Sequence, residues 1–329
     1  MPHRNGTAPI VAARITPASR IVLVGTIPAE VEVALGDLIR DFESVIGTRP
    51  EICKAQGGAL GASVETRVRA STLVRDGEPI CDIIVAAPDD PSATSKPEAH
   101  SVRLEPSPSE GSGRPELVLR GSDTRGTIYA IYTVSQELLG VPPFWYWTGW
   151  EPRPASAISV PIGFERVYHA PYVRWRCLFP NDERMLRALE AKSNCETVPG
   201  AREMLCETVL RLKMNMLEVG ALHKFPNGGE DNNALARARE CRRRGIAVTN
   251  HHHFALGAGL RYWRDYWREI HNKDVPPLTM ESLKLEDLAT FYRDHIRWIR
   301  EEDLEMLWGI GFRGTGDRPW YTSVENPPE

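Results

Sequence analysis

The sequence predicts an α/β protein: a small α/β N-terminal domain followed by the first half, about four βα units, of a (β/α)₈ barrel. Two observations predict this class. Short apolar runs alternate with helical patterns along the chain, which is typical of sheets covered by helices. A proline-containing stretch at 151–171 separates two such series. We therefore expect domains at 1–165 and 166–329, with the linker at the end of the first.

Composition indicates an ordinary globular protein that uses neither nucleic acid nor a membrane. The chain has 329 residues, 42% hydrophobic and 26% charged, with a formal net charge of -4 and no basic excess. The six cysteines show no CxxC spacing, so we expect reduced thiols. No run reaches the roughly twenty apolar residues of a membrane span, and no signal peptide is seen. The chain as written is expected to be cytoplasmic, or secreted or periplasmic if a leader is missing.

The first domain opens with the apolar strand 20–25, followed by a helix that starts near Pro28 and is capped by Gly47. Residues 53–66 are rich in Gly and Ala and indicate a loop. Further strands are expected at 81–87, 101–105 and 116–120. A second helix, capped by one of Ser122, Asp123 and Thr124, extends to Leu139.

The turn GSDTRG (121–126) invites comparison with phosphate-binding loops, but it has neither the GxGxxG nor the GxxxxGK[ST] pattern. We expect a capped helix start there. The segment VPPFWYWTGW (141–150) places five aromatic residues within ten positions. These rings could form a platform for sugars, but the pattern favours a hydrophobic hinge between domains, because aromatic side chains dominate buried interfaces.

The second half predicts four apolar strands, at 172–179, 214–219, 246–250 and 305–312. Helices are expected at about 200–213, 231–244 and 286–301, with a long aromatic insert before the last. Fewer residues follow Pro171 than the roughly 200 of a closed barrel. An open doubly wound sheet is one alternative. We favour a barrel truncated at the C-terminus, because the final TSVENPPE resembles a loop.

Polar side chains follow each of these strands, and in parallel α/β folds the carboxyl ends of the strands form the ligand site. Paired carboxylates with His and Arg suit glycoside hydrolysis, and an arginine matches an anionic sugar. Alternatively, Asp182 and Glu183 cap a helix, and Arg313 and Asp317 form a salt-bridged turn. The rim residues are Asn181, Asp182, Glu183, Glu218, His223, Lys224, Asn250, His251, His252, His253, Arg313 and Asp317.

The run His251–His253 also raises the question of a metal. Adjacent side chains on an extended segment point to opposite faces, so three in a row rarely meet at one ion, and the helical HExxH spacing is absent. We therefore expect no metal and no other cofactor.

Five segments resemble glycoside hydrolase family 115, the xylan α-1,2-glucuronidases. They are GSDTRGTIYAIYTVSQELLGVPPFWYW (121–147), YVRWRCLFPNDE (172–183), LRLKMNML (210–217), TNHHH (249–253) and GIGFRGTGD (309–317). The resemblance implies an α/β domain before a catalytic barrel, and inverting removal of (4-O-methyl)glucuronic acid from xylan without a metal. The chain departs from the family pattern at His253-Phe254 and at Gly314-Thr315-Gly316.

By this resemblance the catalytic residues are Asp182 and Asp317, with the roles of acid and base unassigned. The resemblance also implies that His251, His252 and Arg313 bind the substrate, with Arg313 on the uronate carboxylate. From their place at the end of the first strand, Asn181 and Glu183 are expected to bind substrate as well. The partner is glucuronoxylan or aldouronic oligosaccharides, and a homodimer is left open for a full-length form. Because the family places further catalytic residues on later strands, we expect little turnover from this chain alone. The alternatives are another hexosidase with the same two-domain opening, or a non-catalytic carbohydrate-binding remnant.

Overall fold

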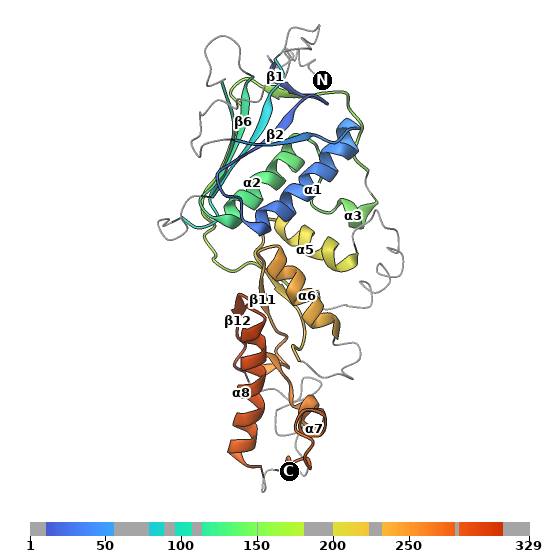
Figure 1. Ribbon diagram of the computed structural model, residues 1–329, viewed down its shortest axis with the longest axis vertical. Helices are drawn as coiled ribbons and strands as arrows, with labels where there is room; N and C mark the ends of the chain where they lie inside the picture. The colour runs from blue at the N-terminus through green and yellow to red at the C-terminus, as the bar shows by residue number, and fades with distance from the viewer. Residues whose placement is uncertain are drawn as a thin grey trace, which may run out of the picture. The chain divides into compact units, whose positions relative to one another are not determined.

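The computed structural model describes residues 11–55, 79–88, 96–106, 114–149, 151–180, 200–223, 232–279 and 283–311 (Figure 1). The chain divides into two compact units. The first comprises Met1–Arg174 and Leu210–Lys213, and the second comprises Trp175–Val209 and Met214–Glu329. Among the described residues, no helix has both the length and the apolar character needed to cross a membrane.

The first unit is built on a mixed sheet with the strand order β3-β2-β4-β6-β5-β8. Its parallel strands are β3 (Glu51–Lys54), β2 (Arg20–Val24), β4 (Asp82–Ala86) and β6 (Glu116–Gly121). The strands β5 (His100–Glu105) and β8 (Glu165–Tyr168) each run antiparallel to the preceding strand in that order. A separate antiparallel pair joins β1 (Val11–Ile15) to β7 (Ile158–Pro161). The α/β class expected from the sequence is confirmed, and its sheet is mixed.

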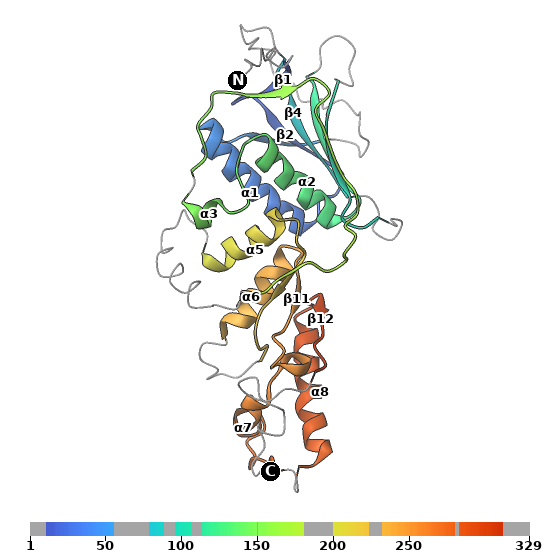
Figure 2. The same cartoon turned by 180° about the vertical axis from the view of Figure 1, so that it is seen from behind.

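The helices α1 (Ala29–Ile46) and α2 (Thr124–Glu137) lie side by side on one face of this sheet, as both ribbon views show (Figures 1 and 2). Gly47 ends α1 in the left-handed region, with φ of 81°, as its position in the sequence predicts. Three strands were not expected. β1 precedes the first expected strand, β3 begins at Glu51 and enters the predicted loop, and β8 lies within the predicted linker. β3 and β8 are edge strands with mostly exposed side chains, so they lack the apolar alternation that marks a strand.

The turn between β6 and α2 is a capped helix start, as predicted. Asp123 is the N-cap residue, and its Oδ1 accepts a hydrogen bond of 2.7 Å from the backbone N–H of Gly126. Its Oδ2 accepts another of 2.9 Å from the N–H of Glu98. A Cβ atom added at Gly121 would lie 1.9 Å from the backbone nitrogen of Thr127. Glycine is therefore required at 121 by the close approach of strand and helix.

A buried polar network crosses the helical layer of this unit. The hydroxyl of Tyr132 donates to Asp37 at 2.6 Å, and Arg40 pairs with the same carboxylate at 2.9 Å. Asp41 forms an ion pair of 2.5 Å with Arg211, and the two side chains are only 1% and 2% exposed. The guanidinium of Arg211 also lies 5.0 Å from the ring centre of Tyr132. Because water does not reach the charges of Asp41 and Arg211, each charge is stabilised only by its protein partners.

The second unit contains a parallel sheet with the strand order β9-β10-β11-β12. The strands are β9 (Cys177–Leu178), β10 (Met216–Glu218), β11 (Ala247–Thr249) and β12 (Met306–Leu307). The helices of this unit include α5 (Ala201–Arg211), whose last two residues count with the first unit, α6 (Asn232–Arg243) and α8 (Leu285–Glu301). All three were expected at nearly these positions.

The first and last strands of this sheet are much shorter than the predicted 172–179 and 305–312. Just before β9, a side chain replaces the backbone of the neighbouring strand as hydrogen-bond acceptor. Oδ1 of Asn215, the residue before β10, accepts the N–H of Arg176 at 2.8 Å. At the other edge, the carbonyl of Gly309 accepts the N–H of Leu256 at 2.8 Å, so the chain after β12 contacts the insert instead of extending along β11. The alternation of apolar residues predicted longer strands. In the structure, each strand pairs with its neighbour over only two or three residues.

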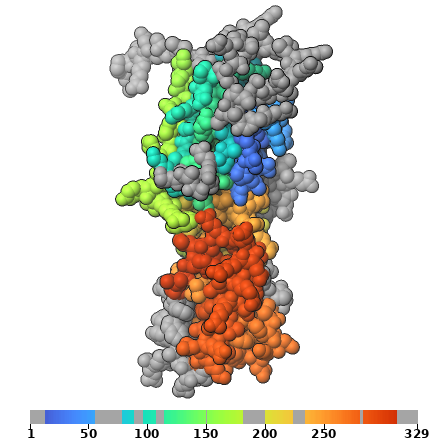
Figure 3. Space-filling model, turned by 60° about the vertical axis from the view of Figure 1, so that its left-hand side comes forward, coloured from blue at the N-terminus to red at the C-terminus, as the bar shows by residue number. Residues whose placement is uncertain are grey.

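The insert between β11 and α8 is folded against that helix. It contains η2 (Ala255–Gly257), η3 (Leu260–Tyr262), the helical turn α7 (Trp263–Asp265) and η4 (Tyr266–Ile270). The rings of Trp263 and Tyr266 lie 5.5 and 5.0 Å from that of Phe291 on α8. Asp294 of α8 accepts the hydroxyl of Tyr266 at 2.7 Å. Figure 3 shows this face of the unit, with the insert (orange) beside α8 (red).

Candidate functional site

The candidate site lies at the carboxyl ends of the parallel strands in the second unit. Of the predicted site residues, the structure describes His251 and His252, directly after β11. The remaining five, together with Lys224, lie outside the described residues, so their placement stays a prediction. They are Asn181, Asp182, Glu183, Arg313 and Asp317.

His251, His252 and His253 form a compact cluster, which we call the histidine cluster. The ring centres lie 3.9 Å apart for His251 and His252, 4.3 Å for His251 and His253, and 4.5 Å for His252 and His253. The expectation that neighbouring rings point to opposite faces is wrong. The segment forms a turn, in which the N–H of Phe254 donates to the carbonyl of His251 at 2.8 Å, and it is therefore not extended.

The potential ligand atoms of the histidine cluster all lie within 4.8 Å of one another. In a tetrahedral site, Zn–N bonds of about 2.0–2.1 Å separate the ligand nitrogens by about 3.4 Å, so the rings would have to close further around an ion. In addition, Nδ1 of His251 accepts the backbone N–H of His253 at 3.3 Å, so the backbone already occupies this nitrogen. The prediction of no metal stays a prediction.

Phe179, the residue directly after β9, contacts the histidine cluster through His251. Its ring centre lies 5.2 Å from that of His251, although β10 separates β9 from β11 in the sheet. Phe179 is 45% exposed, so part of its ring is open to solvent. An aromatic face beside imidazole nitrogens offers apolar contact and hydrogen bonds together, a combination suited to sugar rings. Sequence reasoning missed Phe179, although its place just after the strand and before Pro180 was a usable signal.

Two other rim residues, Glu218 and Asn250, form hydrogen bonds with the backbone at the ends of the strands. Oε1 of Glu218 accepts the N–H of Gly220 at 2.6 Å, and the amide of Asn250 donates to the carbonyl of Gly220. Glu218 is only 5% exposed. Burial, aided by the negative charge of Glu218, raises the pKa of the Cys177 thiol to about 11, so this thiol stays protonated at neutral pH. Glu218 therefore serves the local fold and is not an open carboxylate at the rim.

His223 lies in the interior of the same unit. It is 4% exposed, and its ring centre is 4.6 Å from that of Tyr262 in the insert. The sequence placed it among the rim groups, but the structure packs it against the aromatic core of the insert. A packing contact of this kind explains a buried histidine without assigning it to a substrate.

The aromatic segment 141–150 belongs to the first unit, where Trp145–Thr148 forms the short helix α3. The rings of Trp145 and Tyr146 stack at 4.0 Å, and the guanidinium of Arg40 lies 6.0 and 5.6 Å from their centres. Both side chains are half-buried. A hinge role and a sugar platform are compatible with this packing, so the preference for a hinge stays a prediction.

Comparison with solved structures shows the fold. A family 115 4-O-methyl-α-glucuronidase with specificity for decorated arabinogalactans matches 93% of this chain and 37% of its own, with 20% identity and a TM-score of 0.62. The chain thus spans little more than a third of that enzyme. The chitobiase of Flavobacterium johnsoniae matches 74% of this chain and 32% of its own, with 10% identity and a TM-score of 0.43. A family 138 enzyme that targets pectin rhamnogalacturonan II matches 88% and 30%, with 10% identity and a TM-score of 0.44. The last two are too dissimilar to support a conclusion.

The sequence comparisons add a family match over part of the chain. No curated protein matches the chain. Residues 168–327, which contain the described strand ends and the histidine cluster, match the model of glycosyl hydrolase family 115. Over these 160 residues, just under half of the chain, the protein is similar to glycosyl hydrolase family 115.

Proposed function

We propose that the chain belongs to a glycoside hydrolase that removes (4-O-methyl)glucuronic acid from xylan side chains with inversion. The observation that carries this proposal is the family 115 match over residues 168–327. The contact between Phe179 and His251 supports it, because two separate strand ends approach each other at the rim where a sugar would bind.

The proposed architecture is an N-terminal domain at 1–165 and a domain at 166–329 that forms the first four strands of a (β/α)₈ barrel. In the second unit, the order of the parallel strands in space follows their order in the chain, β9-β10-β11-β12. A doubly wound sheet reverses its order at a switch point, whereas a barrel adds each strand beside the last. The sequential order therefore supports the barrel proposal.

In the proposed mechanism, Arg313 binds the uronate carboxylate through its planar guanidinium. Asp182 and Asp317 are the site acids. In an inverting reaction one carboxylic acid protonates the leaving oxygen while a carboxylate activates water on the opposite face of the sugar, so the two groups need about 6.5–9.5 Å between them. His251 and His252 contribute hydrogen bonds to the sugar, and Asn181 and Glu183 complete the set.

Two polysaccharides are candidates for the polymer that carries the uronic acid. The structurally similar glucuronidase is specific for decorated arabinogalactans, so a uronic acid on an arabinogalactan is a second candidate substrate. The two candidates share the terminal α-linked uronosyl group and differ only in the sugars beyond it.

This chain spans only 37% of the structurally similar glucuronidase, and little turnover is expected from it alone. The test is therefore to incubate a full-length form of the enzyme with glucuronoxylan oligosaccharides and with decorated arabinogalactan, and to quantify released (4-O-methyl)glucuronic acid by chromatography. Removing an acid or base group typically slows such a reaction by about 10²–10⁴-fold, so Asp317→Asn is expected to lose at least a hundredfold. Glu286→Gln, which changes an exposed acid on α8, is the matched control and should keep full activity. The product anomer, followed by NMR, reports inversion.

Full activity in Asp317→Asn would contradict the assignment of that residue. Cleavage of neutral aryl glycosides in place of uronosides would favour a different hexosidase. Calorimetric binding of glucuronic acid without any hydrolysis would favour a carbohydrate-binding protein.

A further inference from the structure

The insert between β11 and α8 carries a groove that none of the site residues above lines. Its volume is about 750 Å³, within the range of ligand sites. The lining residues are Leu260, Arg261, Trp263, Arg264, Asp265, Arg268, Val275, Pro276, Pro277 and Leu278. All of them belong to the second unit, and all lie within the described part of the chain.

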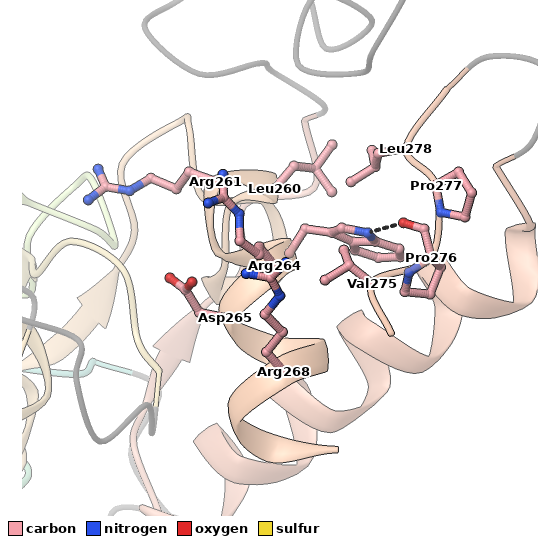
Figure 4. Close-up of a pocket in the computed structure, with 10 residues that line it drawn as sticks. Leu260, Arg261, Arg264, Asp265, Arg268, Val275, Pro276, Pro277 and Leu278 are labelled. Atoms are coloured by element: carbon pink, nitrogen blue, oxygen red, sulfur yellow. Dashed lines mark hydrogen bonds between the residues drawn. The ribbon is translucent and has the colours of Figure 1, made fainter. Parts of the chain in front are cut away.

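The two walls of this groove are held together by the core of the insert. Nε1 of the buried Trp263 donates a hydrogen bond of 2.9 Å to the carbonyl of Pro276 (Figure 4). Leu278, on the same wall as Pro276, is also buried. Since Trp263 packs against Phe291 of α8, the groove is fixed to a helix of the unit and is not a gap between loose loops.

Three arginines supply the charge of the groove. Arg261, Arg264 and Arg268 are spaced by three and four residues, which brings them to one side of the helical turns. All three are exposed, and Arg261 lies 4.8 Å from the ring centre of Tyr262. Among the described residues, Arg264 and Arg268 have no ion-pair partner, and Asp265 is the only acid in the lining. A local excess of positive charge thus occurs in a chain whose formal net charge is -4.

The opposite wall is apolar. Figure 4 shows Val275, Pro276, Pro277 and Leu278 across the groove from the arginine-bearing segment. An anion held only by charge would need no such wall. A ligand that combines carboxylates with ring faces would use both walls, because guanidinium groups bind carboxylates bidentately and apolar side chains cover the C–H faces of a sugar.

We infer that this groove, which we call the arginine groove, binds uronic acid side chains of an acidic polysaccharide and so holds the polymer at a place other than the histidine cluster. The inference rests on the proposed function for the class of substrate. The arginine groove would raise the affinity for the polymer, since a second point of attachment raises the effective concentration of the polysaccharide at the first.

The test compares binding of the whole chain to glucuronoxylan with binding to the same polymer after its carboxyl groups have been reduced to alcohols. Affinity electrophoresis at physiological salt gives the dissociation constants. The double variant Arg264→Gln/Arg268→Gln is expected to bind native glucuronoxylan at least tenfold more weakly than the unmodified protein. Both proteins should bind the reduced polymer equally weakly.

The matched control is Arg293→Gln/Arg300→Gln, which removes two exposed arginines from α8 outside the groove. It should bind glucuronoxylan as the unmodified protein does. Equal loss in both double variants would overturn the inference, because the effect would then be one of net charge. Undiminished binding by the Arg264/Arg268 variant would overturn it as well. So would equally strong, arginine-dependent binding of double-stranded DNA, because the groove would then select any polyanion.

This experiment separates the groove from the proposed function. The binding comparison needs no hydrolysis, so it can succeed even if no uronic acid is ever released. Conversely, hydrolysis of a short aldouronic oligosaccharide that is unaffected by Arg264→Gln/Arg268→Gln, together with unchanged polymer binding, would uphold the proposed function and refute the arginine groove.

Discussion

Replacing Asp41 by asparagine is expected to destabilise the first unit by about 3–5 kcal/mol. The side chain keeps its shape but loses its charge, which removes the carboxylate that lies 2.5 Å from the guanidinium of Arg211. Both side chains are at most 2% exposed, so water cannot replace the lost partner. The penalty is that of a buried charge deprived of its counter-charge, and it exceeds the loss of one hydrogen bond, about 1 kcal/mol.

The same reasoning predicts that removing both charges costs far less than removing one. In Asp41→Leu/Arg211→Met the buried positions become apolar and of similar size, a change that is often neutral or even stabilising. Asp303→Asn is the control, because its ion pair of 2.7 Å with Arg242 is exposed, at 83% and 54%. That variant should lose less than about 1 kcal/mol.

Amide hydrogen exchange of α1 measures the free energy of opening in the first unit specifically, and urea unfolding followed by circular dichroism gives the global value. A loss below about 1 kcal/mol in Asp41→Asn would refute the argument from burial. A double variant less stable than Asp41→Asn would refute it equally, since the cost would then come from packing.

Three further predictions concern pH, packing and the groove. Burial lowers the pKa of His100 and of His295 to about 4, so between pH 6.5 and 4 the unfolded chain binds protons that the folded chain excludes. The free energy of unfolding should therefore fall by about 3 kcal/mol per histidine as the pH drops from 7 to 4. His295→Gln should make this fall smaller in urea titrations at each pH. An equal fall in the variant would contradict the lowered pKa of His295. Gly121→Ala should cost about 1–3 kcal/mol or more in thermal unfolding, because its Cβ meets the backbone of Thr127, whereas Gly36→Ala has free space and should not destabilise. Trp263→Phe loses the hydrogen bond to Pro276 and should weaken glucuronoxylan binding while hydrolysis of short oligosaccharides is unchanged; equal effects on both would point to general unfolding.

Local features of the fold were predictable because local chemistry decides them. Asp123 caps α2 and Gly47 ends α1 at the expected residues, since each position is set by a neighbouring backbone group. Strand length was not predictable in the same way. The apolar alternation before Cys177 extends far beyond the two residues that pair with β10, because pairing depends on a partner that another part of the chain supplies.

The candidate site shows the same division. That the carboxyl ends of the strands meet at one edge follows from sequence order and parallel topology, and the contact of Phe179 with His251 agrees with it. The convergence of the histidine cluster did not follow, because a turn after β11 replaced the extended backbone that was assumed. The arginine groove was also missed, although Arg261, Arg264 and Arg268 occur at helical spacing. Their far wall comes from Val275–Leu278, which sequence spacing alone does not bring close.

The ion pair between Asp41 and Arg211 also sets an order of events during synthesis. The two residues are 170 positions apart in the chain, and Leu210–Lys213 count with the first unit although they follow the first residues of the second. At translation rates of about 5–20 residues per second, Asp41 leaves the ribosome roughly ten to thirty seconds before its partner. During that interval Asp41 has the cation of Arg40 on the same helix, at 3.6 Å, but lacks the closer guanidinium of Arg211. The first unit is therefore expected to reach its final stability only after part of the second has been translated, and a nascent chain stopped before Arg211 should be more sensitive to protease than one stopped after it.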